Sequence, residues 1–174
     1  MIGNEHESLM EDAMTILLRS LAPALVLWCG VAGFAVAEPD AAAHLEVYKS
    51  PTCGCCTKWM AHLTENGFTS TGHHPDDLSD LKRELGVPVR YGSCHTAVSE
   101  DGYIFEGHVP ARYIVRFLDD PVADALGLTV PAMPVGSPGM EYKDQFTPYD
   151  VLLLKKDGST EVYAAVESYE QQFN

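Results

Sequence analysis

The sequence predicts a mixed α/β domain in which a small sheet carries helices on both faces. Strand patterns alternate with helical patterns along the first half of the chain. Apolar residues make up 46% of the 174 positions, which is enough to form one core. A chain of this length has room for one compact domain. We therefore expect a single α/β domain behind an N-terminal leader.

Periodicity and turn residues predict the elements in order. Trp59, Met60 and Leu63 share one helical face, and Gly67 stops that helix. Alternating apolar and polar residues before and after it predict strands. The expected elements are strand 45–48, helix 56–66, strand 68–73, helix 78–85, a hairpin of 96–98 with 103–105, a helix from 110, and a hairpin of 151–154 with 161–165.

The helix from residue 110 carries its apolar residues Ile114, Val115, Phe117 and Leu118 close enough together to cover one face of a sheet. In the helix over 78–85, the leucines are expected to point inward. This order of elements is the one that a thioredoxin-like domain requires.

Residues 121–148 are irregular and rich in Pro and Gly. Loops of this length are usually functional or disordered. The predicted fold is therefore a thioredoxin-like domain with a Pro/Gly-rich C-terminal extension from about residue 121.

Residues 14–37 have the features of a secretory leader, with one basic residue, an apolar stretch and the small-residue ending 35–37. The acidic residues before Met14 are foreign to such leaders and indicate that translation starts at Met14. We expect a signal peptide over 1–37, a mature domain over 38–174, export to the periplasm and no stable membrane insertion after cleavage. An uncleaved membrane anchor is the alternative, because the apolar stretch reaches the lower limit for a spanning helix.

The chain is acidic, with 25 acidic and 11 basic residues and a net charge of −14. Such a charge repels phosphate at long range, so nucleic acid is not an expected partner. Acidity attracts cations but does not by itself identify a metal protein.

The cysteines carry the predicted chemistry. Cys53, Cys55 and Cys56 lie at the expected start of a helix, where Thr52 is the expected cap, and Cys94 is distant in sequence. The helix dipole and free amide groups favour thiolates at this position. Copper(I) accepts thiolates with low coordination and bridging sulfur, whereas zinc prefers four closed ligands. The preferred interpretation is a copper(I) site on these four cysteines.

Two other interpretations stay open at the level of sequence. Cys53 and Cys56 form a C-x-x-C pair, the spacing of thiol–disulfide exchange, and would be the catalytic pair of a metal-free thiol–disulfide oxidoreductase of thioredoxin type. Alternatively, Cys53 pairs with Cys56 and Cys55 pairs with Cys94 as two inert bridges.

Four more residues are candidate metal ligands. His95 is adjacent to Cys94, and His108 precedes the helix from residue 110. Met133 and Met140 lie in the irregular region, where a helical core stripe does not explain them. Thioethers bind copper(I) and do not form disulfides, which suits an oxidising compartment.

Five segments match a known family: residues 48–56 (YKSPTCGCC), 86–88 (GVP), 93–97 (SCHTA), 107–111 (GHVPA) and 133–141 (MPVGSPGME). They resemble the CopG-type copper-resistance proteins of Gram-negative bacteria and span most of the mature chain. The resemblance implies a thioredoxin-like domain whose C-terminal extension contributes to the metal site, and a cysteine-bridged cluster of several copper ions. It also implies interconversion of Cu(I) and Cu(II) ahead of efflux.

The residues that the resemblance carries over as copper ligands are Cys53, Cys55, Cys56, Cys94, His95, His108, Met133 and Met140. Copper oxidoreductase activity is a further hypothesis, and a copper buffer without turnover is its alternative. The expected partners are copper ions and periplasmic copper-efflux or copper-chaperone proteins.

Overall fold

The computed structural model describes residues 43–173. The predicted signal peptide, over 1–37, and the expected start at Met14 lie outside these residues. Among the helices of the described part, none is long and apolar enough to cross a membrane.

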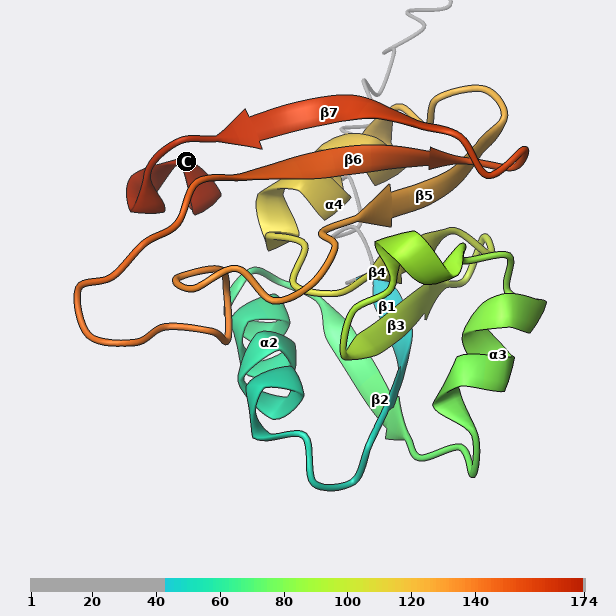
Figure 1. Cartoon of the computed structure of the whole chain (residues 1–174), viewed down its shortest axis with the longest axis horizontal. Coiled ribbons are helices and arrows are strands. Elements are labelled where there is room, and N and C mark those ends of the chain that lie inside the picture. The colour runs from blue at the N-terminus through green and yellow to red at the C-terminus, as the bar shows by residue number, and fades with distance from the viewer. Residues whose placement is uncertain (1–42, 174) are drawn as a thin grey trace, which may run out of the picture. The chain divides into compact units, whose positions relative to one another are not determined.

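Within residues 43–173, seven strands form one sheet and three α-helices pack against it (Figure 1). The strand order is β2-β1-β3-β4-β5-β6-β7. The pairs β1–β2 and β4–β5 are parallel, and the other neighbours are antiparallel. The elements are β1 (His44–Lys49), α2 (Gly54–Glu65), β2 (Thr69–His73), α3 (Leu78–Glu84), β3 (His95–Ser99), β4 (Ile104–Glu106), α4 (Ala111–Asp119), β5 (Ala125–Thr129), β6 (Tyr149–Lys155) and β7 (Thr160–Val166), with 3₁₀ turns at Val89–Tyr91 and Tyr169–Gln172.

Apolar residues pack on both faces of the sheet. Trp59 of α2 and Phe117 of α4 belong to the larger cluster, and Val87 after α3 belongs to the smaller one. Successive strand residues point to opposite faces, so Ile104 joins the smaller cluster while Phe105 joins the larger. Helices α2 and α4 therefore cover one face, and α3 lies on the other side of β1 and β3 (Figure 1). The predicted arrangement of helices on both faces is confirmed.

One part of the sequence prediction is wrong. Residues 121–148 were expected to be irregular, yet they contain β5, which pairs in parallel with β4. At Gly127 a Cβ would lie 1.8 Å from the Ile104 carbonyl oxygen, so this approach requires glycine. The Gly and Pro residues of this region indicated a loop, but residues Ala125–Thr129 within it form a strand.

The expected helix faces are only partly correct. In α4, Ile114 and Phe117 are buried, but Val115 is 42% exposed and Leu118 is only half-buried. Helix α3 has no fully buried residue, and its leucines are half-buried. The helix therefore contributes little to the larger core.

Candidate metal centre

Helix α2 begins with the cysteine motif. Cys53 is the N-cap residue, and its Sγ accepts a hydrogen bond from the Cys56 amide at 3.3 Å. The prediction that Thr52 caps the helix is therefore wrong. The extended backbone of Cys53 turns its sulfur toward the first helical turn, where free amide groups favour negative charge.

The four cysteines of the described chain lie together, with all their Sγ atoms within 4.8 Å of one another. The Sγ of Cys55 is 3.4 Å from that of Cys53 and 4.0 Å from that of Cys94. The Sγ of Cys56 is 3.5 Å from that of Cys94. The fold thus brings Cys94, which directly precedes β3, to the start of α2.

The oxidation state of the cysteines is mixed. A disulfide joins Cys53 to Cys56, with Cα atoms 5.4 Å apart, and Cys55 and Cys94 are free thiols. Of the two disulfides in the interpretation with inert bridges, Cys53–Cys56 is therefore present and Cys55–Cys94 is not. A disulfide offers no thiolate, so reduction of this bond is needed before all four sulfurs can act as soft ligands.

Two imidazoles lie close to the Cys94 sulfur. The Cys94 Sγ lies 3.0 Å from His108 Nε2 and 3.2 Å from His95 Nδ1. The Nδ1–H of His108 donates to the Pro138 carbonyl at 2.7 Å. This bond leaves the Nε2 lone pair facing the sulfur, which is the orientation of a metal-ligating histidine.

Burial sets the charge of this group. Burial and, second to it, the adjacent Cys55 together raise the pKa of Cys94 to about 12. Burial lowers the pKa of His108, and it lowers that of His95 still more, with His108 as the next cause. Both imidazoles are therefore neutral at neutral pH. A thiol proton on Cys94 can bond to either ring, and a cation bound by the sulfur would take the place of that proton.

His95 has one further property that bears on metal binding. Its Nε2 is buried, and within the described residues it has no hydrogen-bond partner. Unpaired buried nitrogen atoms are rare in native proteins and call for an explanation. Sulfur and neutral imidazole nitrogen form a donor set that suits copper(I), so the residues present fit this ion.

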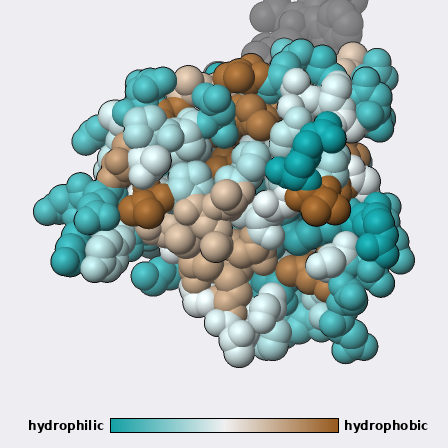
Figure 2. Space-filling view, viewed as in Figure 1, coloured by the Kyte–Doolittle hydropathy of each residue, from teal (hydrophilic) through white to brown (hydrophobic). Residues whose placement is uncertain are grey.

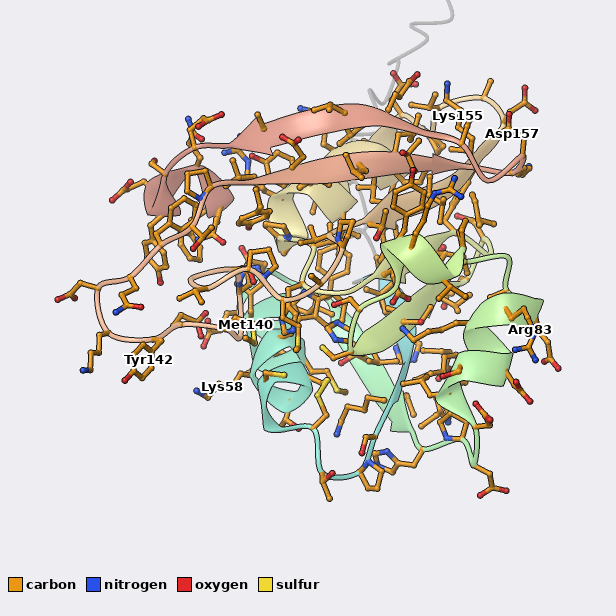
Figure 3. All side chains as sticks on the ribbon, in the orientation of Figure 1. Lys58, Arg83, Met140, Tyr142, Lys155 and Asp157 are labelled. Carbon is orange, nitrogen blue, oxygen red and sulfur yellow. A yellow bond between two sulfur atoms is a disulfide. The ribbon has the colours of Figure 1, made fainter. Side chains whose placement is uncertain are left out.

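The loop after β5 packs onto the start of α2. Gly139 has φ +87°, and a Cβ there would lie 2.6 Å from the Cys55 carbonyl oxygen. Met140 is half-buried and lies beside α2 (Figure 3), while Met133, on the same loop, is 49% exposed. In the same view, Figure 2 shows mildly apolar side chains over α2 and this loop. Both methionines thus lie on the loop that packs against α2 through Gly139.

Contacts that the sequence did not reveal hold α2 against the site. Trp59 donates its indole N–H to the Val109 carbonyl at 2.8 Å. Its ring packs on the ring of His95, with 4.3 Å between the ring centroids. The buried His62 accepts the Ala111 amide proton through Nε2 at 3.1 Å. His62 follows Trp59 by three residues on one helical face, and this spacing is the signal for its inward position.

Fold and site together define an α/β protein with a sulfur-rich candidate metal centre. Two solved structures, described as copper resistance protein CopG, form 1 and form 2, are similar to this chain with TM-scores of 0.67 and 0.68. Each is 44% identical in sequence and covers 72% of this chain and 98% of its own. The chain belongs to this CopG-type copper-resistance family.

Two other comparisons complete the assignment. Residues 91–140 match the family described as "Protein of unknown function, DUF411". This match includes Cys94, His95 and His108 but not the cysteines of α2. No curated protein matches the chain.

Proposed function

We propose that this chain is an exported copper-binding protein that supports copper resistance. Its Cys53, Cys55, Cys56 and Cys94 would share copper(I) ions as a cysteine-bridged cluster. The observation that carries the proposal is the gathering of four sulfur atoms within 4.8 Å of one another. Thiolates select soft ions, and copper(I) tolerates the bridging that such close sulfurs favour.

The proposed ligand set extends beyond sulfur. His108 presents a lone pair toward Cys94 because the Pro138 carbonyl holds its other nitrogen. His95 Nδ1 lies 3.2 Å from the same sulfur, and the lack of a partner for its Nε2 within residues 43–173 supports a role in the site. Met133 and Met140 would add thioethers from the loop over α2, a role that remains a prediction for both.

We further propose that Cys53 and Cys56 are redox partners of copper. Oxidation of the two thiols to the disulfide releases two electrons and two protons. These electrons suffice to reduce two Cu(II) ions to Cu(I), and the reverse reaction oxidises two Cu(I) ions. The disulfide between Cys53 and Cys56, beside the free thiol of Cys55, supports this role. Copper is the substrate of this step.

The strand order supports a thioredoxin-like core. The order β2-β1-β3-β4, with β1 and β2 parallel and β3 antiparallel to β1, is the pairing expected of such a domain. The extension from about residue 121 would then add strands and the loop over α2.

The secretory pattern of residues 14–37 and the copper-resistance relatives support a periplasmic location, where efflux or chaperone proteins would supply or accept copper.

The alternative is a metal-free thiol–disulfide oxidoreductase. One observation favours it, namely the disulfide of the C-x-x-C pair at the start of a helix. In that case Cys55 and Cys94 would be dispensable.

A copper count on the full chain separates the two functions. The protein is reduced without oxygen, loaded with copper(I), desalted, and analysed for copper per chain. We expect Cys55→Ser to lose most of the bound copper, because Cys55 lies within 4.0 Å of both Cys53 and Cys94 sulfurs. Thr57→Ser, at an exposed position of the same helix α2, is the matched control and should retain it. Unchanged copper in Cys55→Ser, with disulfide reduction lost in Cys56→Ser, would favour the dithiol enzyme.

The redox step has its own test. Oxidised copper-loaded protein is treated with a dithiol reductant, and copper(II) is followed by paramagnetic resonance. Interconversion predicts a signal that disappears on reduction and returns on oxidation. Copper that keeps one oxidation state throughout would leave a buffer without turnover.

A further inference from the structure

We propose that Glu106 is a positioning residue that fixes Cys94 in the metal centre, an inference that rests on the proposed copper site. Its side chain is fully buried at the end of β4. One carboxylate oxygen accepts the backbone N–H of Ser93 at 2.6 Å. Because Ser93 directly precedes Cys94, this bond fixes the backbone from which the Cys94 sulfur projects.

The remaining bonds of the carboxylate hold it in place. Lys82 of α3, whose side chain is 12% exposed, forms an ion pair with Glu106. Thr96 of β3 donates its hydroxyl to the other carboxylate oxygen at 2.5 Å and accepts a bond from Lys82 at 3.0 Å. Each side chain of this network thus has a partner, so the carboxylate has little freedom to move away from Ser93.

The segment around Glu106 contacts the segment around Cys94 residue by residue. The Gly107 amide donates to the His95 carbonyl at 3.0 Å, and His108 Nε2 lies 3.0 Å from the Cys94 sulfur. At Gly107 a side chain would clash, because its Cβ would lie 2.6 Å from the Cβ of Ser93. The two segments therefore form one rigid unit, and Glu106 anchors one end of it.

Stability alone does not account for this buried ion pair. Removing two charges from water is costly, and an apolar pair of similar size is often as stable or more so. An apolar pair, however, cannot accept the N–H of Ser93. The specific contribution of Glu106 is therefore this acceptor, placed one residue before a metal-site sulfur.

Cys94 is only partly buried, and it borders an opening on the side of α3. A cavity of about 400 Å³ opens there, and Lys82, Ser93 and Cys94 are among its lining residues. Loss of the Ser93 anchor should loosen this wall. The reactivity of the Cys94 thiol in copper-free protein therefore reports its positioning without any copper measurement.

The experiment compares two double variants of the full chain. Both remove the ion pair: Lys82→Met with Glu106→Leu, and Lys82→Met with Glu106→Gln. Only glutamine keeps an oxygen for the Ser93 N–H. Copper-free protein is treated with iodoacetamide, and labelling of Cys94 is followed by peptide mass spectrometry, which separates it from other thiols. Copper(I) affinity is then measured by competition with a chelator.

We expect the leucine variant to alkylate at Cys94 about tenfold faster than wild type, the size of effect produced by one unsatisfied buried amide. Its copper(I) affinity should fall by about 10- to 100-fold, as for lost outer-shell contacts. The glutamine variant should behave as wild type in both assays. The matched control is the exposed pair Lys155–Glu161 on the β6–β7 hairpin, and its Met/Leu replacement should change neither quantity.

Equal alkylation rates in the leucine variant and wild type would overturn the proposal, as would equal changes in both double variants. Should the leucine variant fail to fold, Glu106→Asp replaces it, because it withdraws the carboxylate from Ser93 by one methylene. An unchanged rate in that variant would overturn the proposal too. If wild type binds no copper, the proposed function fails, while the alkylation rates still decide the role of Glu106.

Discussion

Protonation of His62 should weaken the attachment of the cysteine helix α2 to the start of α4. His62 is 7% exposed, and its Nε2 accepts the Ala111 amide proton at 3.1 Å. An imidazolium cannot accept this bond. Burial lowers the pKa of His62 in the folded protein below its ordinary value of 6.5. The folded state therefore binds its proton at lower pH than the unfolded chain does.

This difference gives a signed dependence of stability on pH. Well above pH 6.5 neither state is protonated at His62, and its full contribution is present. As the pH falls below that value, the unfolded chain takes up a proton that the folded chain does not. The free energy of unfolding then decreases by up to about 1.4 kcal/mol per pH unit for this histidine, until the folded pKa is reached.

Two substitutions test this, with urea unfolding measured between pH 8 and pH 5. His62→Gln keeps an acceptor but does not titrate, so its stability should match wild type at pH 8 and depend less on pH below 6.5. His62→Ala leaves a buried amide unpaired and should lose about 1–3 kcal/mol at pH 8. The exposed His74 supplies the control substitution, His74→Gln. A pH dependence in His62→Gln equal to that of wild type would refute the reasoning.

Three further predictions concern the contacts around α2. In urea unfolding, Gly139→Ala should lower the free energy of unfolding by more than about 2 kcal/mol, because the strain of a positive φ and the clash with α2 add together. Gly67→Ala, with φ +86° but open space around its Cβ, should lower it by only about 1 kcal/mol. Equal losses in the two variants would contradict the packing argument. Trp59→Phe removes an indole bond of 2.8 Å and should lower the free energy of unfolding by about 1–2 kcal/mol; no loss would show that this bond is not stabilising. Met140→Leu should weaken copper(I) binding in competition titrations more than Met133→Leu, because Met133 is 49% exposed; the reverse order would contradict the proposed role of the loop.

Local patterns predicted the elements that position the cysteines. Alternation located β1, and the apolar spacing with its closing glycine located α2, because these signals depend only on near neighbours. Strand β5 was missed, since Gly127 serves a close approach between strands that a local pattern does not encode. The pairing of Lys82 with Glu106 was missed for a similar reason, because it joins α3 to β4, two elements that are distant in the sequence.

The site was predictable in its residue types and less so in its state. Cysteines three residues apart at a helix start are close by helical geometry, so their grouping follows from sequence. The approach of Cys94 depends on the pairing of β1 with β3, a non-local contact. Whether Cys53 and Cys56 are bonded depends on redox conditions, which residue spacing does not determine.

X-ray absorption at the copper edge of the anaerobically loaded full chain tests the central claim most directly. The account predicts that copper is bound mainly by sulfur, with copper neighbours at short range from bridging thiolates, and that Cys55→Ser removes the copper neighbours. Copper surrounded only by nitrogen and oxygen, or a fully reduced protein that holds no copper, would contradict it.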